Sequence, residues 1–198
     1  GYHRGRWGAG YEEIESLDVR EGPYALWEKA TIGDAVVETA LRPEGASELA
    51  AVLVRVRPSG GGFDGDEVVF DVRKGRASLR RHSAGQVKTL AEADVPLRSD
   101  RWTRLRVETA GRRVRVWFDG EPAPRFDVTY AGPAPAPGKL GVRAWGSGVN
   151  VKDVYLTNAG ARVRVDEVPP PTPAEVDREA LASFCLVVLN LNEFVYIR

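Results

Sequence analysis

Polar and apolar side chains alternate along most of the chain between residues 24 and 157. A period of two is typical of β-strands that bury one face, because successive side chains of a strand point to opposite sides. In the stretch RVRVWF, the alternation directs Val114, Val116 and Phe118 to the face that we expect in the core. Trp117 points to the opposite face.

Turn residues separate the alternating segments at intervals of about 8 to 12 residues, as in all-β sandwiches and barrels. Lys74-Gly75 and Asp119-Gly120 are two such turns. Connections this short favour antiparallel pairing, because parallel strands need crossovers of about a dozen residues or more. The expected strands cover residues 35–42, 49–56, 67–73, 77–83, 86–91, 102–110, 113–120, 125–130, 140–145 and 149–157.

These strands mix polar and apolar side chains, so we expect each sheet to have one face in the core and one in water. The pattern therefore predicts an all-β fold, an antiparallel two-sheet sandwich. The glycine-rich stretch 59–66 is expected to form a mobile loop. The proline-rich stretch 132–138 is expected to cross an edge of the sandwich, because proline cannot take part in a central strand.

The period changes after a proline-rich spacer at residues 169–173. Thr172, Pro173 and Glu175 match a helix N-cap, a first-turn proline and the glutamate of a capping box. We therefore expect one C-terminal α-helix that ends near residue 189. The predicted organisation is a β-sandwich over 1–160, a Pro-rich linker over 161–172, and a C-terminal helix with an extended tail over 173–198.

The composition excludes several classes of function. Twenty-eight basic residues balance 28 acidic residues, so no overall field draws the chain to nucleic acid or to an anionic membrane. Cys185 is the only cysteine, which excludes an internal disulfide and the C-x-x-C-H attachment of a c-type haem. No apolar run reaches the ~20 residues of a membrane span. The chain has no methionine and starts with Gly1, from which we interpret it as a piece of a longer protein.

The stretch from Trp102 to Leu156 contains W-x-x-L-x-V-E, V-x-V-W-F-D-G-E-P, G-x-L-G-V-R-A-W and V-x-V-K-D-V-Y-L. In these motifs it resembles the concanavalin A-like lectin/glucanase superfamily. Within that superfamily it is similar to laminin-G-like modules and to the domains named after bacterial 3-keto-disaccharide hydrolases. The resemblance implies a concanavalin A-like jelly roll of two sheets, and it identifies a fold better than an activity.

The last residues, LASFCLVVLNLNEFVYIR, show a second resemblance. They are similar to the C-terminal end of a planctomycete domain of unknown function, found in large proteins with cytochrome-c-like and lectin-like domains. The resemblance implies that the other domains of a parent protein are partners of this chain, and that the location is periplasmic or extracellular. The matching positions are Asn190, Asn192, Glu193, Phe194 and Tyr196.

Candidate catalytic groups are sparse. Laminarinase-like hydrolases of the same superfamily place E-x-D-x-x-E on one strand, which directs alternate carboxylates into a cleft. This chain lacks that spacing, and Asp66 and Asp71 fall on opposite faces of a regular strand. The G-x-S-x-G motif is absent as well, and His82 is expected in water at a hairpin end. We therefore predict that the chain is not an enzyme.

No cofactor is predicted. Zinc is disfavoured by a single cysteine and two distant histidines. The resemblance implies calcium as the better alternative, because related sandwiches bind it through loop carboxylates, and Asp64 and Asp66 flank Gly65. Two carboxylates do not make a site, so the alternative interpretation of this pair is a polar turn.

Aromatic side chains on the outer faces of strands are candidates for a sugar-binding platform, although each ring competes with ordinary packing. Trp117 is either exposed on the outer face or covered by a neighbouring segment, with Arg115 stacked on it. Trp102, which precedes a strand, is assigned to the core. The candidate ligand-binding residues are Trp117, Arg115, Trp145 and Tyr155.

Three functions are compatible with these features. The first is a noncatalytic lectin-like module of a larger bacterial protein, which supports carbohydrate binding or domain assembly. The second is a glycoside hydrolase that acts on a disaccharide or a glucan. The third is a purely structural module, in which the C-terminal helix docks on the sandwich.

Overall fold

The structure is a computed structural model. It describes the backbone alone for three short N-terminal strands, and both backbone and side chains for most of residues 24–166. In the N-terminal part it gives the backbone of β1 (His3–Arg4), β2 (Trp7–Ala9) and β3 (Ile14–Ser16). The predicted C-terminal helix and tail lie outside the described residues. Side chains are described for residues 24–43, 49–60, 62–99, 101–145 and 148–166.

The ordered elements of the described ranges are strands. No helix long and apolar enough to cross a membrane occurs among these residues. The strands are β4 (Tyr24–Ile32), β5 (Ala35–Pro43), β6 (Leu49–Ser59), β7 (Gly62–Asp71), β8 (Arg76–Ser83), β9 (Gln86–Asp94), β10 (Thr103–Ala110), β11 (Arg113–Phe118), β12 (Phe126–Thr129), β13 (Gly138–Trp145), β14 (Val149–Asn158) and β15 (Ala161–Arg164).

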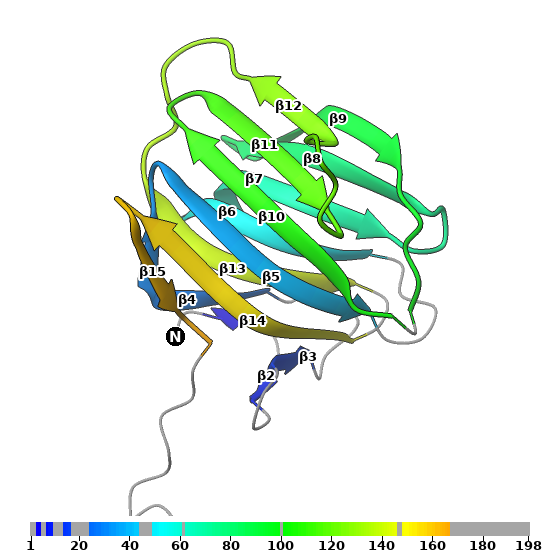
Figure 1. Ribbon diagram of the computed structural model, residues 1–198. Coiled ribbons are helices and arrows are strands. Elements are labelled where there is room, and N and C mark those ends of the chain that lie inside the picture. Colours follow the sequence, from blue (N-terminus) through cyan, green and yellow to red (C-terminus); the bar gives the residue numbers. More distant parts are fainter. Residues whose placement is uncertain are drawn as a thin grey trace, which may run out of the picture. The chain divides into compact units, whose positions relative to one another are not determined.

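The strands form two antiparallel sheets that pack as two layers (Figure 1). Sheet A has the order β1-β4-β13-β6-β7-β8-β9, and sheet B has the order β12-β11-β10-β5-β14-β3-β2, with β15 paired to β14. This arrangement confirms the predicted two-sheet antiparallel sandwich. The stretch 132–138 connects β12 in sheet B to β13 in sheet A. β15 extends sheet B beyond residue 160, into the range predicted as a linker.

The core lies between the sheets and contains phenylalanine rings in edge-on contact. The Phe70 ring of sheet A lies 5.7 Å from the Phe118 ring of sheet B, and the Phe126 ring lies 5.9 Å from Phe118. Val114, Val116 and Phe118 are all buried. The inward face predicted for the stretch RVRVWF is therefore confirmed.

Sheet A also buries apolar side chains outside this core. Leu53 and Val69 have no exposed surface and form a separate cluster with Tyr24 and Phe63. Leu53 alternates along β6 with residues of the main core, so the cluster lies on the opposite face of the sheet. The expectation of a solvated outer face is not met on this part of sheet A.

The glycine-rich stretch 59–66 is not the loop that its composition predicts, because β7 begins at Gly62. Gly65 explains the difference. A Cβ atom on Gly65 would lie 3.0 Å from the Val56 Cα and 3.1 Å from the Arg55 carbonyl oxygen. The glycine therefore lets β7 approach the bulge in β6, and it serves strand pairing rather than loop mobility.

A small polar cluster lies inside the sandwich, where Asp66 and Arg81 are direct neighbours on β7 and β8. The Asp66 carboxylate has no exposed surface, and its Oδ1 lies 3.6 Å from Arg81 Nη1. The Arg81 guanidinium lies 4.5 Å from the centre of the Tyr130 ring. Burial raises the pKa of the Asp66 carboxyl, and the nearby Tyr130, Arg81 and Arg55 only partly offset this effect.

Replacement of Asp66 by asparagine is expected to change how stability depends on pH. The folded protein binds the Asp66 proton more tightly than the unfolded chain, whose pKa is near 3.8. The stability that Asp66 contributes is therefore fully present below that value and is lost as the pH rises through the raised folded-state pKa. In thermal unfolding, the Tm of Asp66→Asn minus the Tm of the parent chain should increase as the pH rises. A difference in Tm that is constant with pH would contradict this account.

Candidate functional site

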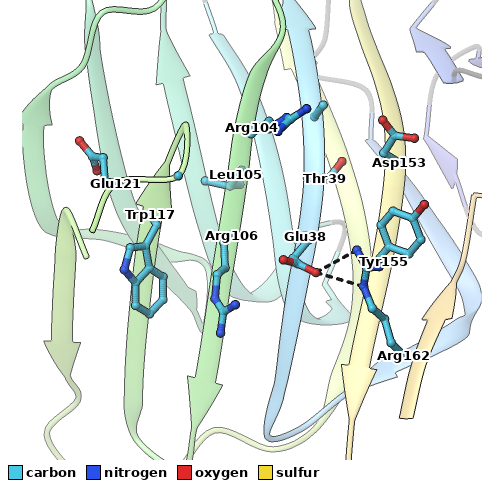
Figure 2. Close-up of a pocket in the computed structure, with 12 residues that line it drawn as sticks. Glu38, Thr39, Arg104, Leu105, Arg106, Trp117, Glu121, Asp153, Tyr155 and Arg162 are labelled. Carbon is cyan, nitrogen blue, oxygen red and sulfur yellow. Dashed lines mark hydrogen bonds and ion pairs between the residues drawn. The ribbon is translucent and has the colours of Figure 1, made fainter. Parts of the chain in front are cut away.

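A groove of about 700 Å³ crosses the outer face of sheet B (Figure 2). Its volume falls within the roughly 300–1,000 Å³ that is usual for small-molecule sites. The lining side chains come from four strands of sheet B, from β15 and from the turn after β11. They are Glu38, Thr39, Ala40, Arg104, Leu105, Arg106, Trp117, Gly120, Glu121, Asp153, Tyr155 and Arg162.

Four of these residues form one row across the sheet. Arg106 pairs in register with Trp117 on one side and with Glu38 on the other. Glu38 in turn pairs with Tyr155. Neighbouring strands lie about 4.8 Å apart, so the two aromatic residues are about 14 Å apart across three spacings. Figure 2 shows Trp117 and Tyr155 at opposite sides of the groove, with Arg106 and Glu38 between them.

The Tyr155 side of the groove is held by an ion pair. The Arg162 Nη2 atom lies 3.1 Å from Glu38 Oε2, and the Arg162 guanidinium lies 3.7 Å from the centre of the Tyr155 ring. Both charged side chains are partly exposed, so the pair contributes at most about 1 kcal/mol to stability. Its clearer effect is to fix Arg162 against the tyrosine ring.

Two arginines flank the ring on the Trp117 side. Trp117 is half-buried, and the guanidinium groups of Arg106 and Arg115 lie 5.3 and 5.4 Å from the centre of its ring. Both arginines form salt bridges with Glu108. Arg104 also lines the groove, and its guanidinium makes no salt bridge within the ranges that the structure describes. The groove thus combines aromatic rings with a strongly polar floor.

The structure places the predicted ligand-binding residues in two locations. Trp117 and Tyr155 line the groove, and Arg115 lies beside the Trp117 ring. Trp145 lies on β13 of sheet A and lines a different pocket. The sequence did not single out Glu38, which joins the row only because β5 lies between β10 and β14.

Two other assignments from the sequence are wrong. Trp102 is half-buried rather than in the core, because Arg42 and Lys152 lie against its ring at 4.9 and 4.4 Å. His82 is not in water at a hairpin end. Its side chain is 13% exposed, and its Nε2 atom lies 2.8 Å from Glu67 Oε2.

The described part of the chain does not offer a set of ligands for a metal ion. No group of three or more His, Cys, Asp or Glu side chains there is placed to hold a metal ion. Asp64 accepts a hydrogen bond from the Ala84 backbone N–H at 2.8 Å, and Asp66 is buried. Of the two carboxylates considered for calcium, Asp64 therefore binds the backbone of a turn and Asp66 is enclosed in the sandwich.

Residues 7–157 match the model of the 3-keto-alpha-glucoside-1,2-lyase-like domain. The chain belongs to this family. The match to this lyase-like family confirms the resemblance to 3-keto-disaccharide hydrolase-like domains. A search of the curated proteins found no match.

Solved structures similar to this lyase-like domain share its fold at low sequence identity. The carbohydrate-binding module CBM66 from Bacillus subtilis is 16% identical with a TM-score of 0.68, over 78% of this chain and 92% of the module. A protein of unknown function with a galectin-like fold from Bacillus subtilis is 13% identical with a TM-score of 0.65, over 82% of this chain and 90% of that protein. The β-glucanase of Bacillus licheniformis is 13% identical with a TM-score of 0.51, over 74% of this chain and 71% of the glucanase. The fold is thus a jelly roll of the kind found in carbohydrate-binding modules and glucanases.

The family contradicts the prediction that the chain is not an enzyme. Its description is that of an enzymatic activity, and a β-glucanase shares the fold, so catalysis is not excluded. The prediction relied on the absence of E-x-D-x-x-E, which belongs to hydrolysis by paired carboxylates. A lyase-like reaction has no need of that carboxylate spacing.

Proposed function

We propose that this chain binds a glycoside in the groove of sheet B. The observation that supports this function best is the row Trp117, Arg106, Glu38 and Tyr155 across four strands. Aromatic rings offer flat apolar surfaces that pack against the apolar faces of sugar rings. Arginine donors and a carboxylate acceptor between the rings suit the hydroxyl groups of a sugar.

The dimensions favour a ligand of more than one sugar ring. The two aromatic residues are about 14 Å apart, at three strand spacings of about 4.8 Å. One sugar ring can therefore pack on Trp117 while another lies near Tyr155. The fold that the chain shares with a carbohydrate-binding module supports the same class of ligand.

Calorimetric titration with laminaritriose, maltotriose and sucrose tests this proposal. We expect saturable binding of at least one of these sugars, and Trp117→Ala should weaken it by about 2 kcal/mol, which is roughly thirtyfold. Trp102→Ala is the matched control, because Trp102 lies outside the groove, beneath Arg42 and Lys152. Absence of binding to every sugar, or an equal loss in both variants, would overturn the proposal.

A second function is elimination from a 3-keto-α-glucoside, and the family match over residues 7–157 favours it. The ketone at C3 acidifies the proton on C2, so a carboxylate can remove that proton and leave an enolate. When the enolate collapses, a C1–C2 double bond forms and the C1–O bond breaks. The departing alkoxide takes up a proton from the carboxylic acid formed in the first step, which restores the carboxylate. All three charged residues Glu38, Arg104 and Arg106 line the groove. In the proposed reaction Glu38 acts as the base, and Arg104 and Arg106 stabilise the enolate oxygen.

Incubation of the chain with methyl 3-keto-α-glucoside tests this second function. The product is a conjugated enone with an ultraviolet absorbance that the substrate lacks. We expect this absorbance to appear together with methanol in equal amounts. If no enone forms, the elimination is excluded, and the sugar-binding proposal is still decided by calorimetry.

A further inference from the structure

A second pocket, of about 370 Å³, lies on sheet A and shares no residue with the groove of sheet B. Its ionisable side chains other than tyrosine are Glu67 on β7, Arg80 and His82 on β8, and Arg143 on β13. Aromatic side chains complete the wall. The volume falls within the range of about 300–1,000 Å³ that is usual for small-molecule sites.

The centre of this pocket is a buried carboxylate. The Glu67 side chain is 1% exposed, and its Oε2 atom lies 2.8 Å from His82 Nε2. The Glu67 Oε1 atom lies 3.4 Å from Arg143 Nη1. A buried charge is costly unless it is paired and hydrogen-bonded, so these partners fix Glu67 in place.

Aromatic rings hold both basic partners of Glu67. The Phe63 ring lies 4.3 Å from the His82 ring at an angle of 31°. The Arg143 guanidinium lies 3.7 Å from the centre of the Trp145 ring and 5.5 Å from that of Phe63. Contacts on several sides leave these side chains little freedom. The part of the pocket formed by Glu67, His82 and Arg143 is therefore preorganised for a ligand.

Arg80 differs from its neighbours in the pocket, because its guanidinium is not paired with the Glu67 carboxylate. It pairs in register with Glu67 across β7 and β8, and it lines the pocket. Within the described part of the chain, the Arg80 guanidinium forms no salt bridge and no hydrogen bond. Three basic side chains thus surround one carboxylate, and an arginine fork is left to bind an anion.

We propose that this pocket binds an acidic monosaccharide, with its carboxylate on Arg80 and its ring against the aromatic wall. Arginine presents two parallel N–H donors that match the two oxygens of a carboxylate. The His82 imidazole, which Glu67 holds in place and which is 13% exposed, supplies a polar atom for a sugar hydroxyl. The site is independent of the groove, because the two pockets lie on different sheets.

Titration with D-glucuronate, with D-glucose as the neutral analogue, tests this site. The chain has two histidines, so the imidazole signals of His82 are readily assigned by NMR. We expect these signals to shift saturably with D-glucuronate and not with D-glucose. Arg80→Gln should weaken D-glucuronate binding by at least about tenfold, and Arg80→Lys, which keeps the charge without the fork, should weaken it less.

Two control variants distinguish binding at this site from nonspecific attraction to surface arginines and from binding in the groove. Arg113→Gln removes an exposed arginine that is paired with Asp127 on sheet B, and it should leave D-glucuronate binding unchanged. Trp117→Ala disables the groove and should also leave it unchanged. The proposal is overturned if D-glucuronate causes no saturable shift of His82, if D-glucose binds equally well, or if Arg80→Gln and Arg80→Lys bind as the parent chain does.

Discussion

Replacement of Glu38 by glutamine is expected to slow elimination from methyl 3-keto-α-glucoside by about 100-fold to 10,000-fold, the range typical of a lost general base. The amide keeps the size of the side chain and can still accept a hydrogen bond from Arg162. It cannot take the proton from C2. The rate of appearance of the enone measures the loss directly.

Asp127→Asn is the control for this experiment. Asp127 is an acidic residue on β12, the edge strand of sheet B; it forms a salt bridge with Arg113 on β11 and lies outside the groove. The Asp127→Asn variant should therefore catalyse the elimination at the parent rate. A Glu38→Gln variant that also keeps the parent rate would show that another group removes the proton.

Replacement of Phe118 by alanine is expected to lower the free energy of unfolding by about 3–5 kcal/mol. Phe118 is 2% exposed, and its ring contacts both Phe70 of the facing sheet and Phe126 of the neighbouring strand. Removal of the ring leaves a cavity where the two sheets meet. Urea unfolding followed by circular dichroism measures the change.

Val87→Ala is the reference for this stability measurement. Val87 is 56% exposed on β9, so its truncation should change the free energy of unfolding by no more than about 0.5 kcal/mol. If Phe118→Ala were as mild as Val87→Ala, Phe118 would not be a central part of the core.

The positions of most strands are predictable because a period of two is a local property. The stretch RVRVWF, for example, reveals its buried face from six consecutive residues. The strand at 62–66 is not predictable in this way, because its glycines are typical of loops. Gly65 is required by a bulge in a different strand, and a pairing between strands leaves no periodic signal in either sequence.

The candidate site is predictable only in part, for a related reason. Alternation places Trp117 and Tyr155 on outer faces, but it does not tell which sheet an outer face belongs to. Trp145 has the same local pattern, yet it lies on sheet A. Glu38 and Arg106 become neighbours through the order β10-β5-β14, in which strands distant in sequence lie side by side. The chemistry of the groove therefore emerges from topology.

NMR of the tryptophan indole N–H groups tests the central claim, that a glycoside binds across the groove of sheet B. The chain has five tryptophans, and single Trp substitutions assign their signals. During titration with a sugar that binds in calorimetry, we predict a saturable shift of the Trp117 signal, while the signals of Trp102 and Trp145 stay in place. Saturable binding with an unshifted Trp117 signal would contradict the account.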